Sequence, residues 1–343
     1  MLQSAYKFLH HNFLILLILS YVCSAFCPQA GLQLRQINFG NLYWFDGSHI
    51  KFTISVLMMS ILLFNAGFGF KVEELKQISQ KPLLVVVVCF VNLLAHLVVL
   101  LVIYGMLKLW HSNNELQCLI LGLSIVASMP IAGASTAWSQ NADGNIGLSL
   151  GLVMLSTFTS PITTPIILNC FKLFTDTKYD KYLTNLSEHG TNTFLILAIV
   201  LPSLIGILAR IKFKKHNSNT QIKLINLIIL LLLNYSNACL SLPEILVKPD
   251  WDFYALVLAV TFLICSLSYL FGFMIAKYFK CNKADTASIV FALGMNNNGT
   301  GLVLAGLMLS NLPRVMLPLI FYTLIQQVLA AIIDKYYFSK SKI

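Results

Sequence analysis

Long runs of mainly apolar residues recur along the whole chain, and the shorter segments between them hold most of the charged residues. A helix of about 20 apolar residues crosses the hydrocarbon layer of a bilayer, which is about 30 Å thick. Ten such runs lie near residues 13–27, 51–70, 82–107, 117–142, 145–171, 192–210, 221–242, 252–279, 286–310 and 315–333. The pattern predicts an all-α polytopic membrane protein with about ten transmembrane helices.

The first run allows two interpretations. Lys7 precedes the short apolar stretch FLILLILSYVCSAF, and small residues follow it, as in a signal peptide. We expect a retained first helix, because its removal would leave an odd number of spans.

Ten runs divide into two sets of five, residues 1–171 and residues 172–343. An odd number of spans in each half makes the second half enter the membrane upside down relative to the first. The sequence therefore predicts two inverted five-helix repeats.

The fourth and ninth runs carry polar and helix-breaking residues in their middle. The fourth contains SMPIAGASTAWSQNADGN, from Ser128 to Asn145, and the ninth contains ALGMNNNGTG, residues 292–301. Irregular backbone at membrane depth is tolerated only where protein or a water-filled cavity surrounds it, and paired interruptions of this kind mark transporter binding sites. Small residues also serve close helix packing, but three adjacent asparagines cannot all face one neighbouring helix. We therefore predict a binding site formed by both segments.

The composition supports a membrane protein. Hydrophobic residues make up 57% of the chain and charged residues only 10%, whereas soluble domains average roughly 45–50% and 25%. The net charge of +10 comes from basic residues between the apolar runs, where they set orientation rather than bind nucleic acid. An inside N-terminus puts fifteen of the 23 Lys and Arg residues on the inner side. We expect a multi-pass protein of the plasma membrane, such as a bacterial inner membrane, with both termini cytoplasmic.

The chemistry-bearing residues argue against an enzyme. The eight cysteines form no CxxC pair, and the 13 acidic residues all fall in loops or at the ends of the predicted spans. Neither a zinc site nor a disulfide framework is indicated, and no Ser/His/Asp set lies within the spans. We expect no cofactor.

Several motifs together resemble the bile acid:sodium symporter family. They are PIAGAST, then GNIGLSLGLVMLSTFTSPITTP, and later GMNNNGTGLVLA, with further likeness in LLFNAGFGFKVEEL and KPLLVVVVCFVN. The resemblance runs from about residue 50 to the C-terminus. It implies a panel domain of helices one, two, six and seven, and a core domain of helices three, four, five, eight, nine and ten. Helices four and nine would be broken and cross at the centre of the core.

The same resemblance implies a secondary transporter that works by alternating access. Its substrate would be a small organic anion, such as a bile acid or a pantoate-like carboxylate, with sodium ions held behind the crossing. The start of each second half-helix would bind the substrate, because helix N-termini with free amide donors suit a carboxylate. These positions are Gly133, Ala134, Ser135, Asn297 and Asn298. The bilayer is the other expected partner, with no obligate protein partner.

The first sodium site of the family is only partly kept. Ser135 and Ser149 match it, and Thr136 stands where the family has Asn. Val153 replaces a Thr, and Ala292 replaces a Glu whose carboxylate would offset the cost of dehydrating the ion. Because that carboxylate is missing, we expect this site to be degraded.

The second sodium site is expected to survive in reduced form. Asn92 and Asn296 are shorter stand-ins for two Gln residues, and the backbone carbonyls of Ala292, Leu293 and Met295 remain. Sodium coupling is therefore our expectation, with two alternatives open. One is a sodium-independent or proton-linked organic anion carrier, similar to auxin efflux carriers. The other is a relative that has lost transport.

Other polar residues within the runs are candidates to line the crevice. They are Asn65, His96, Asn234 to Asn237, Gln326 and Gln327. Polar residues in membrane helices more often bond a neighbouring helix, for about 0.6 kcal/mol on average. His96 has the additional interpretation of a proton carrier.

Overall fold

The computed structural model describes residues 2–45, 47–70, 80–188, 191–213, 220–247 and 249–338. The basic residues at 71–79, 214–219, 248 and 339–343, which contribute to the predicted orientation, lie outside this part, as do residues 71–75 of the LLFNAGFGFKVEEL motif.

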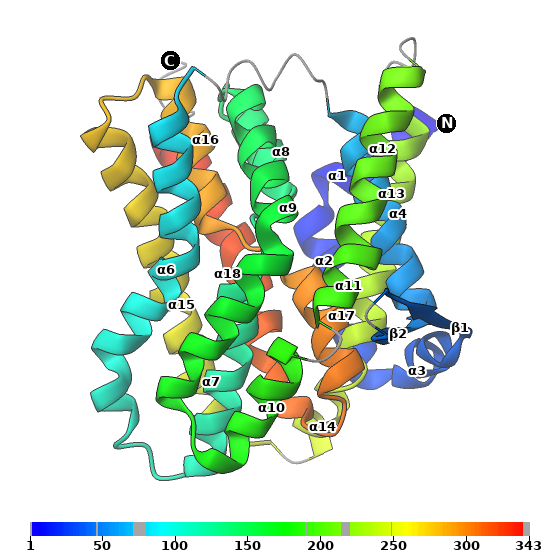
Figure 1. Cartoon of the computed structure of the whole chain (residues 1–343), viewed down its shortest axis with the longest axis vertical. Helices are drawn as coiled ribbons and strands as arrows, with labels where there is room; N and C mark the ends of the chain where they lie inside the picture. The colour runs from blue at the N-terminus through cyan, green and yellow to red at the C-terminus, as the bar shows by residue number, and fades with distance from the viewer. Residues whose placement is uncertain are drawn as a thin grey trace.

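The described chain is helical except for one hairpin (Figure 1). Its helices are α1 (Leu2–His11), α2 (Phe13–Phe26), α3 (Pro28–Gln36), α4 (Ile54–Gly69), α6 (Pro82–Leu107), α7 (Asn113–Ser128), α8 (Ala134–Asn141), α9 (Ile146–Phe171), α10 (Thr177–Glu188), α11 (Thr191–Phe194), α12 (Leu201–Lys212), α13 (Thr220–Ala238), α14 (Leu242–Val247), α15 (Trp251–Tyr278), α16 (Lys283–Gly294), α17 (Asn298–Met308) and α18 (Met316–Ile333). A π-helix, Leu195–Val200, joins α11 to α12, and another, Asp334–Phe338, follows α18.

Fewer helices than the ten predicted runs are long enough to cross a membrane. Among the described residues six qualify: Pro82–Leu107, Ile146–Phe174, Thr177–Lys212, Thr220–Ala238, Trp251–Tyr278 and Pro313–Phe338. A seventh results if α2 and α3, which meet at an angle of 89°, form one span. The chain is thus a multi-pass membrane protein with six or seven apolar spans.

The missing spans have identifiable physical causes. The runs near 117–142 and 286–310 are each divided into two helices, α7 with α8 and α16 with α17, none of which is a full span. The run near 51–70 is helical only from Ile54, and its 16 residues reach about 24 Å at 1.5 Å per residue. The count of ten spans and the inverted repeat stay predictions.

The hairpin was not predicted. Strands β1 (Asn38–Tyr43) and β2 (His49–Thr53) pair antiparallel, with Leu42 opposite Ile50. The turn between them contains Gly47 at a φ of 82°, a conformation open to glycine. The sequence FDGSH between two runs of aromatic and β-branched residues was the available signal.

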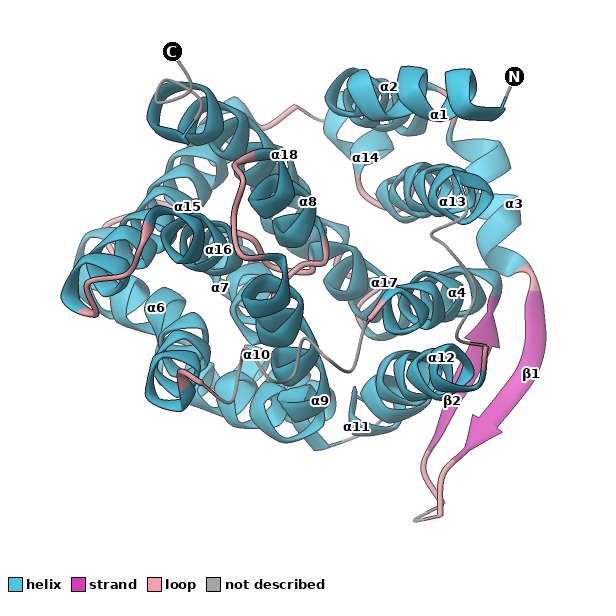
Figure 2. Ribbon diagram, turned by 90° about the horizontal axis from the view of Figure 1, so that it is seen from above, coloured by secondary structure: helices cyan, strands magenta, loops and turns pink. Residues whose placement is uncertain are grey.

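The helices form two groups when the molecule is seen from above (Figure 2). In one, α2, α4, α12 and α13 pack together, and α4 approaches α12 so closely that a Cβ at Gly67 or Gly206 would collide with the facing backbone. In the other, α6, α9, α15 and α18 pack around α7, α8 and α16, which belong to the broken segments. Helix α17 contacts both α18 and α13, so it lies where the groups meet. That a panel and a core exist and move as separate units remains a prediction.

Candidate functional site

The two interrupted segments meet and pair through their backbones. Ile131 and Asn296 form an isolated antiparallel β-bridge. On either side, the Ala132 N–H donates to the Met295 carbonyl at 2.9 Å, and the Asn297 N–H donates to the Pro130 carbonyl at 2.8 Å. Backbone groups freed by a helix break must find partners within a membrane. Here backbone groups freed in one segment form hydrogen bonds with those of the other, so the two segments form one crossing.

Side chains from neighbouring helices complete the crossing. The Ile131 N–H donates to Ser156 Oγ at 3.1 Å, and Thr164 Oγ1 donates to the Ser128 carbonyl at 2.7 Å, both from α9. Gln326 of α18 accepts from the Asn296 N–H at 3.1 Å and donates to the Asn296 carbonyl at 3.3 Å. Gln326 therefore braces the crossing instead of lining an open crevice. The bracing by α9 was missed, although the hydroxyl-rich sequence STFTSPITT was its signal.

Four of the buried unpaired oxygens belong to residues predicted to bind substrate or sodium. Asn92 Oδ1, Ser135 Oγ, Asn296 Oδ1 and Asn298 Oδ1 have no hydrogen-bond partner in the described part of the chain. Each of the four residues is at most 2% exposed. Burying a polar atom without a partner costs about 1–3 kcal/mol, and most such atoms in native proteins are paired. Each of these oxygens therefore has lone pairs available to a ligand such as a cation.

The first predicted sodium site is assembled only in part. Thr136 Oγ1 of α8 lies 3.1 Å from Ser149 Oγ of α9, so two predicted ligands lie side by side. Ala292 is completely buried, and Val153 is nearly so, and neither side chain offers an oxygen. The hydroxyl part of this site is present without the carboxylate.

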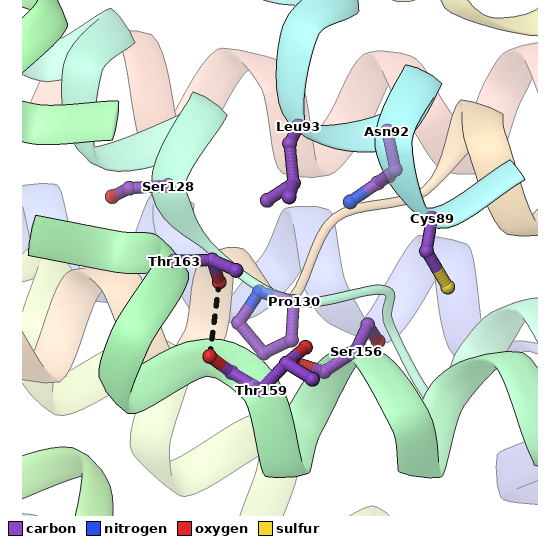
Figure 3. Close-up of a pocket in the computed structure, with 8 residues that line it drawn as sticks. All are labelled: Cys89, Asn92, Leu93, Ser128, Pro130, Ser156, Thr159 and Thr163. Carbon is purple, nitrogen blue, oxygen red and sulfur yellow. Dashed lines mark hydrogen bonds between the residues drawn. The ribbon is translucent and has the colours of Figure 1, made fainter. Parts of the chain in front are cut away.

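His96 lies beside the residues of the second predicted sodium site. Asn92 lies beside the α7 break, in a small pocket with Pro130 and Ser156 (Figure 3). One helical turn along α6, His96 Nε2 lies 3.3 Å from Asn296 Nδ2 and 3.0 Å from the Tyr322 hydroxyl. His96 is therefore the α6 residue that hydrogen-bonds Asn296, and Asn92 stays a predicted sodium ligand. Positions i and i+4 share one helix face, so the two residues lie on the same side of α6.

The remaining predicted sodium positions lie at the C-terminal end of α16. Leu293 is buried there beside Ala292, and the Met295 carbonyl already accepts from Ala132. A carbonyl oxygen has two lone pairs, so this bond leaves Met295 able to contact an ion as well.

The predicted substrate residues occupy the more open side of the crossing. Gly133 is exposed, and a Cβ built on it would meet no atom within 4 Å, while Ala134 is half-buried. Asn297 is also half-buried, and its side-chain oxygen caps α17 by accepting from the Thr300 N–H at 3.3 Å. The cap leaves the amide nitrogen of Asn297 as the donor for a ligand. In contrast, Ser135 and Asn298 point into the protein.

Three of the other polar candidates form interhelical hydrogen bonds. Asn65 donates to Asn226 Oδ1 at 2.6 Å, which joins α4 to α13. Asn234 accepts from the Tyr21 hydroxyl at 3.2 Å, which joins α13 to α2. Gln327 accepts from the Trp138 indole at 2.8 Å. These contacts favour a structural role for all three.

Residues 56–248 match the Sodium Bile acid symporter family. The chain belongs to this family. Membership places it among membrane transporters and not among enzymes. The chain is also 23% identical, over 270 residues, to the uncharacterized sodium-dependent transporter YocS of Bacillus subtilis (strain 168). This alignment covers 78% of this chain and 77% of YocS. It is 24% identical, over 284 residues, to the uncharacterized protein YbaS of the same organism, covering 80% of this chain and 85% of YbaS.

The family match includes the interruption between α7 and α8 and ends before the interruption between α16 and α17. Both relatives align over about four fifths of this chain. As a symporter family member, the chain is therefore expected to share an overall architecture with these relatives.

Proposed function

We propose that this symporter family member is a sodium-dependent carrier of a small organic anion, a bile acid-like or pantoate-like carboxylate, which works by alternating access. The observation that carries the proposal is the group of unpaired buried oxygens at the crossing. The relative YocS is named as a sodium-dependent transporter, which supports sodium as the cation. We also propose the two inverted repeats, residues 1–171 and 172–343, and the panel and core as the moving units.

The proposed sodium ion binds to neutral oxygens. Asn296 Oδ1 and Asn298 Oδ1 from the α16–α17 break, with Ser135 Oγ from α8, supply unpaired ligands. Hard cations such as calcium and magnesium prefer carboxylate, carbonyl and hydroxyl oxygens, and sodium follows the same preference. Because no carboxylate neutralises the ion, its positive charge remains to attract the substrate anion. This attraction couples the two bound species.

The proposed substrate carboxylate binds where α8 and α17 begin. The proposed donors there are the amide nitrogen of Asn297 and the Gly299 N–H, since the Asn298 N–H already donates to the Asn296 carbonyl and the Thr300 N–H to Asn297 Oδ1. A helix N-terminus also favours negative charge. Beside this point, Gly299 lies near Met59 of α4 and Leu233 of α13. These apolar side chains offer a surface to the organic part of the substrate.

A second candidate is a sodium-independent or proton-linked carrier on the same fold. Ala292 in place of the family Glu, and Val153 in place of Thr, favour it, because both remove oxygen ligands. The proposed location is the plasma membrane with both termini cytoplasmic. The placement of the two chain ends toward the same end of the molecule supports termini on one side of the membrane (Figure 1), and the distribution of basic residues favours the cytoplasmic side.

The proposal is tested by uptake into proteoliposomes. Purified protein takes up labelled cholate or pantoate faster under an inward sodium gradient than under a matched potassium gradient. Asn297→Ala reduces this uptake by at least about tenfold, because one hydrogen bond to a charged ligand contributes roughly 1.5–3 kcal/mol. The control Asn41→Ala, at an exposed position of β1, transports like the wild type. Uptake that is indifferent to sodium would favour the second candidate, and no uptake of either acid would contradict an organic anion carrier of this kind.

A further inference from the structure

Arg35 is a half-buried cation without an acidic partner. It lies on α3, and its Nη1 donates to Asn237 Oδ1 of α13. The ion pairs of the described residues involve Lys81, His111 and Arg314 and leave Arg35 out. A guanidinium carries five N–H donors, so one neutral oxygen satisfies only a small part of it.

The residue that contacts Arg35 also lacks an acceptor. Asn237 is completely buried, and its Nδ2 has no hydrogen-bond partner among the described residues. Buried charges and buried donors without partners are costly. Arg35 and Asn237 thus present unsatisfied donors side by side, and what both lack is an anionic acceptor.

This donor pair lies at the boundary between the two helix groups. A Cβ built on Gly306 of α17 would lie 3.0 Å from Cζ and 3.0 Å from Nη1 of Arg35, and closer still to Nη2. The guanidinium therefore packs against the α17 backbone while it contacts α13. Gly306 follows Asn298 by eight residues, or about 12 Å along the helix axis. The pair lies on the same helix as the crossing but near its other end.

We propose that Arg35 and Asn237 form a second anion-binding position, which holds the carboxylate of the transported organic anion on its path to or from the crossing. This inference rests on the proposed function, because the same substrate occupies both positions in turn. Guanidinium groups bind carboxylates through two parallel N–H bonds. The carboxylate replaces Asn237 Oδ1 as the acceptor for Arg35 when α17 separates from α3 and α13, and the Asn237 amide then donates to it as well.

The competing explanation is that Arg35 only fastens α3 to α13. The two explanations give different results for Asn237→Asp, a substitution of nearly equal size: a fastening role leaves anion affinity unchanged, and an anion site loses affinity. A carboxylate at position 237 strengthens a fastening contact. It also neutralises Arg35 internally and repels an incoming carboxylate, so it weakens an anion site.

The test measures equilibrium binding of labelled cholate and labelled pantoate to the full-length protein in nanodiscs. We expect affinity to fall about tenfold in both Arg35→Gln and Asn237→Asp, as for the loss of one charge-assisted pair, and to fall less in Arg35→Lys. The control Lys51→Gln removes an exposed cation of β2 and leaves affinity unchanged. Each variant is checked by size-exclusion chromatography, and Asn237→Asp keeps the test decisive if Arg35→Gln does not fold.

The outcomes separate this inference from the proposed function. Binding that is abolished by Asn297→Ala but unchanged in Asn237→Asp overturns the second position alone. Wild-type protein that binds neither acid overturns both proposals. Weaker binding in Arg35→Gln and Asn237→Asp, with a normal Lys51→Gln, supports the second position.

Discussion

Single residues determine what the crossing can bind. Ala292 and Val153 place methyl groups where the family resemblance implies oxygens, while Asn296 and Asn298 leave amide oxygens unpaired. Neutral oxygens compensate a dehydrated cation less well than a carboxylate does, because they carry no net charge. The site is therefore expected to hold sodium weakly on its own and more tightly when the substrate anion is present.

Restoring the carboxylate tests this view. Ala292→Glu is expected to raise sodium affinity by roughly tenfold, or about 1.4 kcal/mol, measured as the sodium concentration for half-maximal uptake. Ala292→Gln is the matched control, since it has the same size without the charge. Equal sodium affinities in the Glu and Gln variants would contradict a cation site beside Ala292.

At the scale of elements, the start of α16 is fixed by a buried carboxylate. Asp285 is 1% exposed and forms an ion pair with Lys81, which precedes α6. Its other oxygen accepts from Asn145 Nδ2 at 2.8 Å, which precedes α9. The hydrogen bond from Lys81 to Asp285 raises the pKa of the lysine above its usual range. This network ties three helices together at the end of α16 opposite the crossing.

Removing the lysine is expected to destabilise the protein. Lys81→Met leaves the buried carboxylate with only Asn145, and the expected loss is about 1 kcal/mol, since Lys81 is itself 45% exposed and solvent screens the pair. Because the pKa of Lys81 is raised on folding, its contribution is complete below the ordinary lysine pKa and is lost as the pH rises through the raised value. Thermal unfolding in detergent at neutral and strongly alkaline pH measures both effects. A wild-type advantage over Lys81→Met that is unchanged at alkaline pH would contradict this assignment.

For the whole molecule, the arrangement of two helix groups around one crossing suits alternating access. The groups meet at α17, whose first turn lies near Met59 and Leu233 and whose later part packs against Arg35. Relative movement of the groups would therefore change access to both proposed anion positions. The orientation of this assembly in the membrane follows from the predicted inside position of the termini.

Cysteine labelling checks that orientation. Phe45, at the hairpin tip, is 96% exposed, and the predicted topology places it outside, whereas Lys212 at the end of α12 is placed inside. Phe45→Cys is expected to react with a membrane-impermeant maleimide on intact cells, and Lys212→Cys only after permeabilisation. The unsubstituted protein, with its eight native cysteines, gives the background. The reverse pattern would invert the topology and place Arg35 at the inner side.

The sequence by itself determined the membrane class, the helical character of the long apolar runs, the two interruptions and the family. These features depend on local composition and on residues such as Pro130 and Gly299, whose effect on the backbone needs no distant partner. It did not determine the β-hairpin, the short helix Ile54–Gly69 or the contact of His96 with Asn296. Only the tertiary structure brought together His96 and Asn296, 200 residues apart, and Arg35 and Asn237, 202 residues apart. Whether a polar side chain is satisfied or left unpaired depends on such distant neighbours, and for this reason the unpaired oxygens and the Arg35–Asn237 contact became visible only in the folded chain.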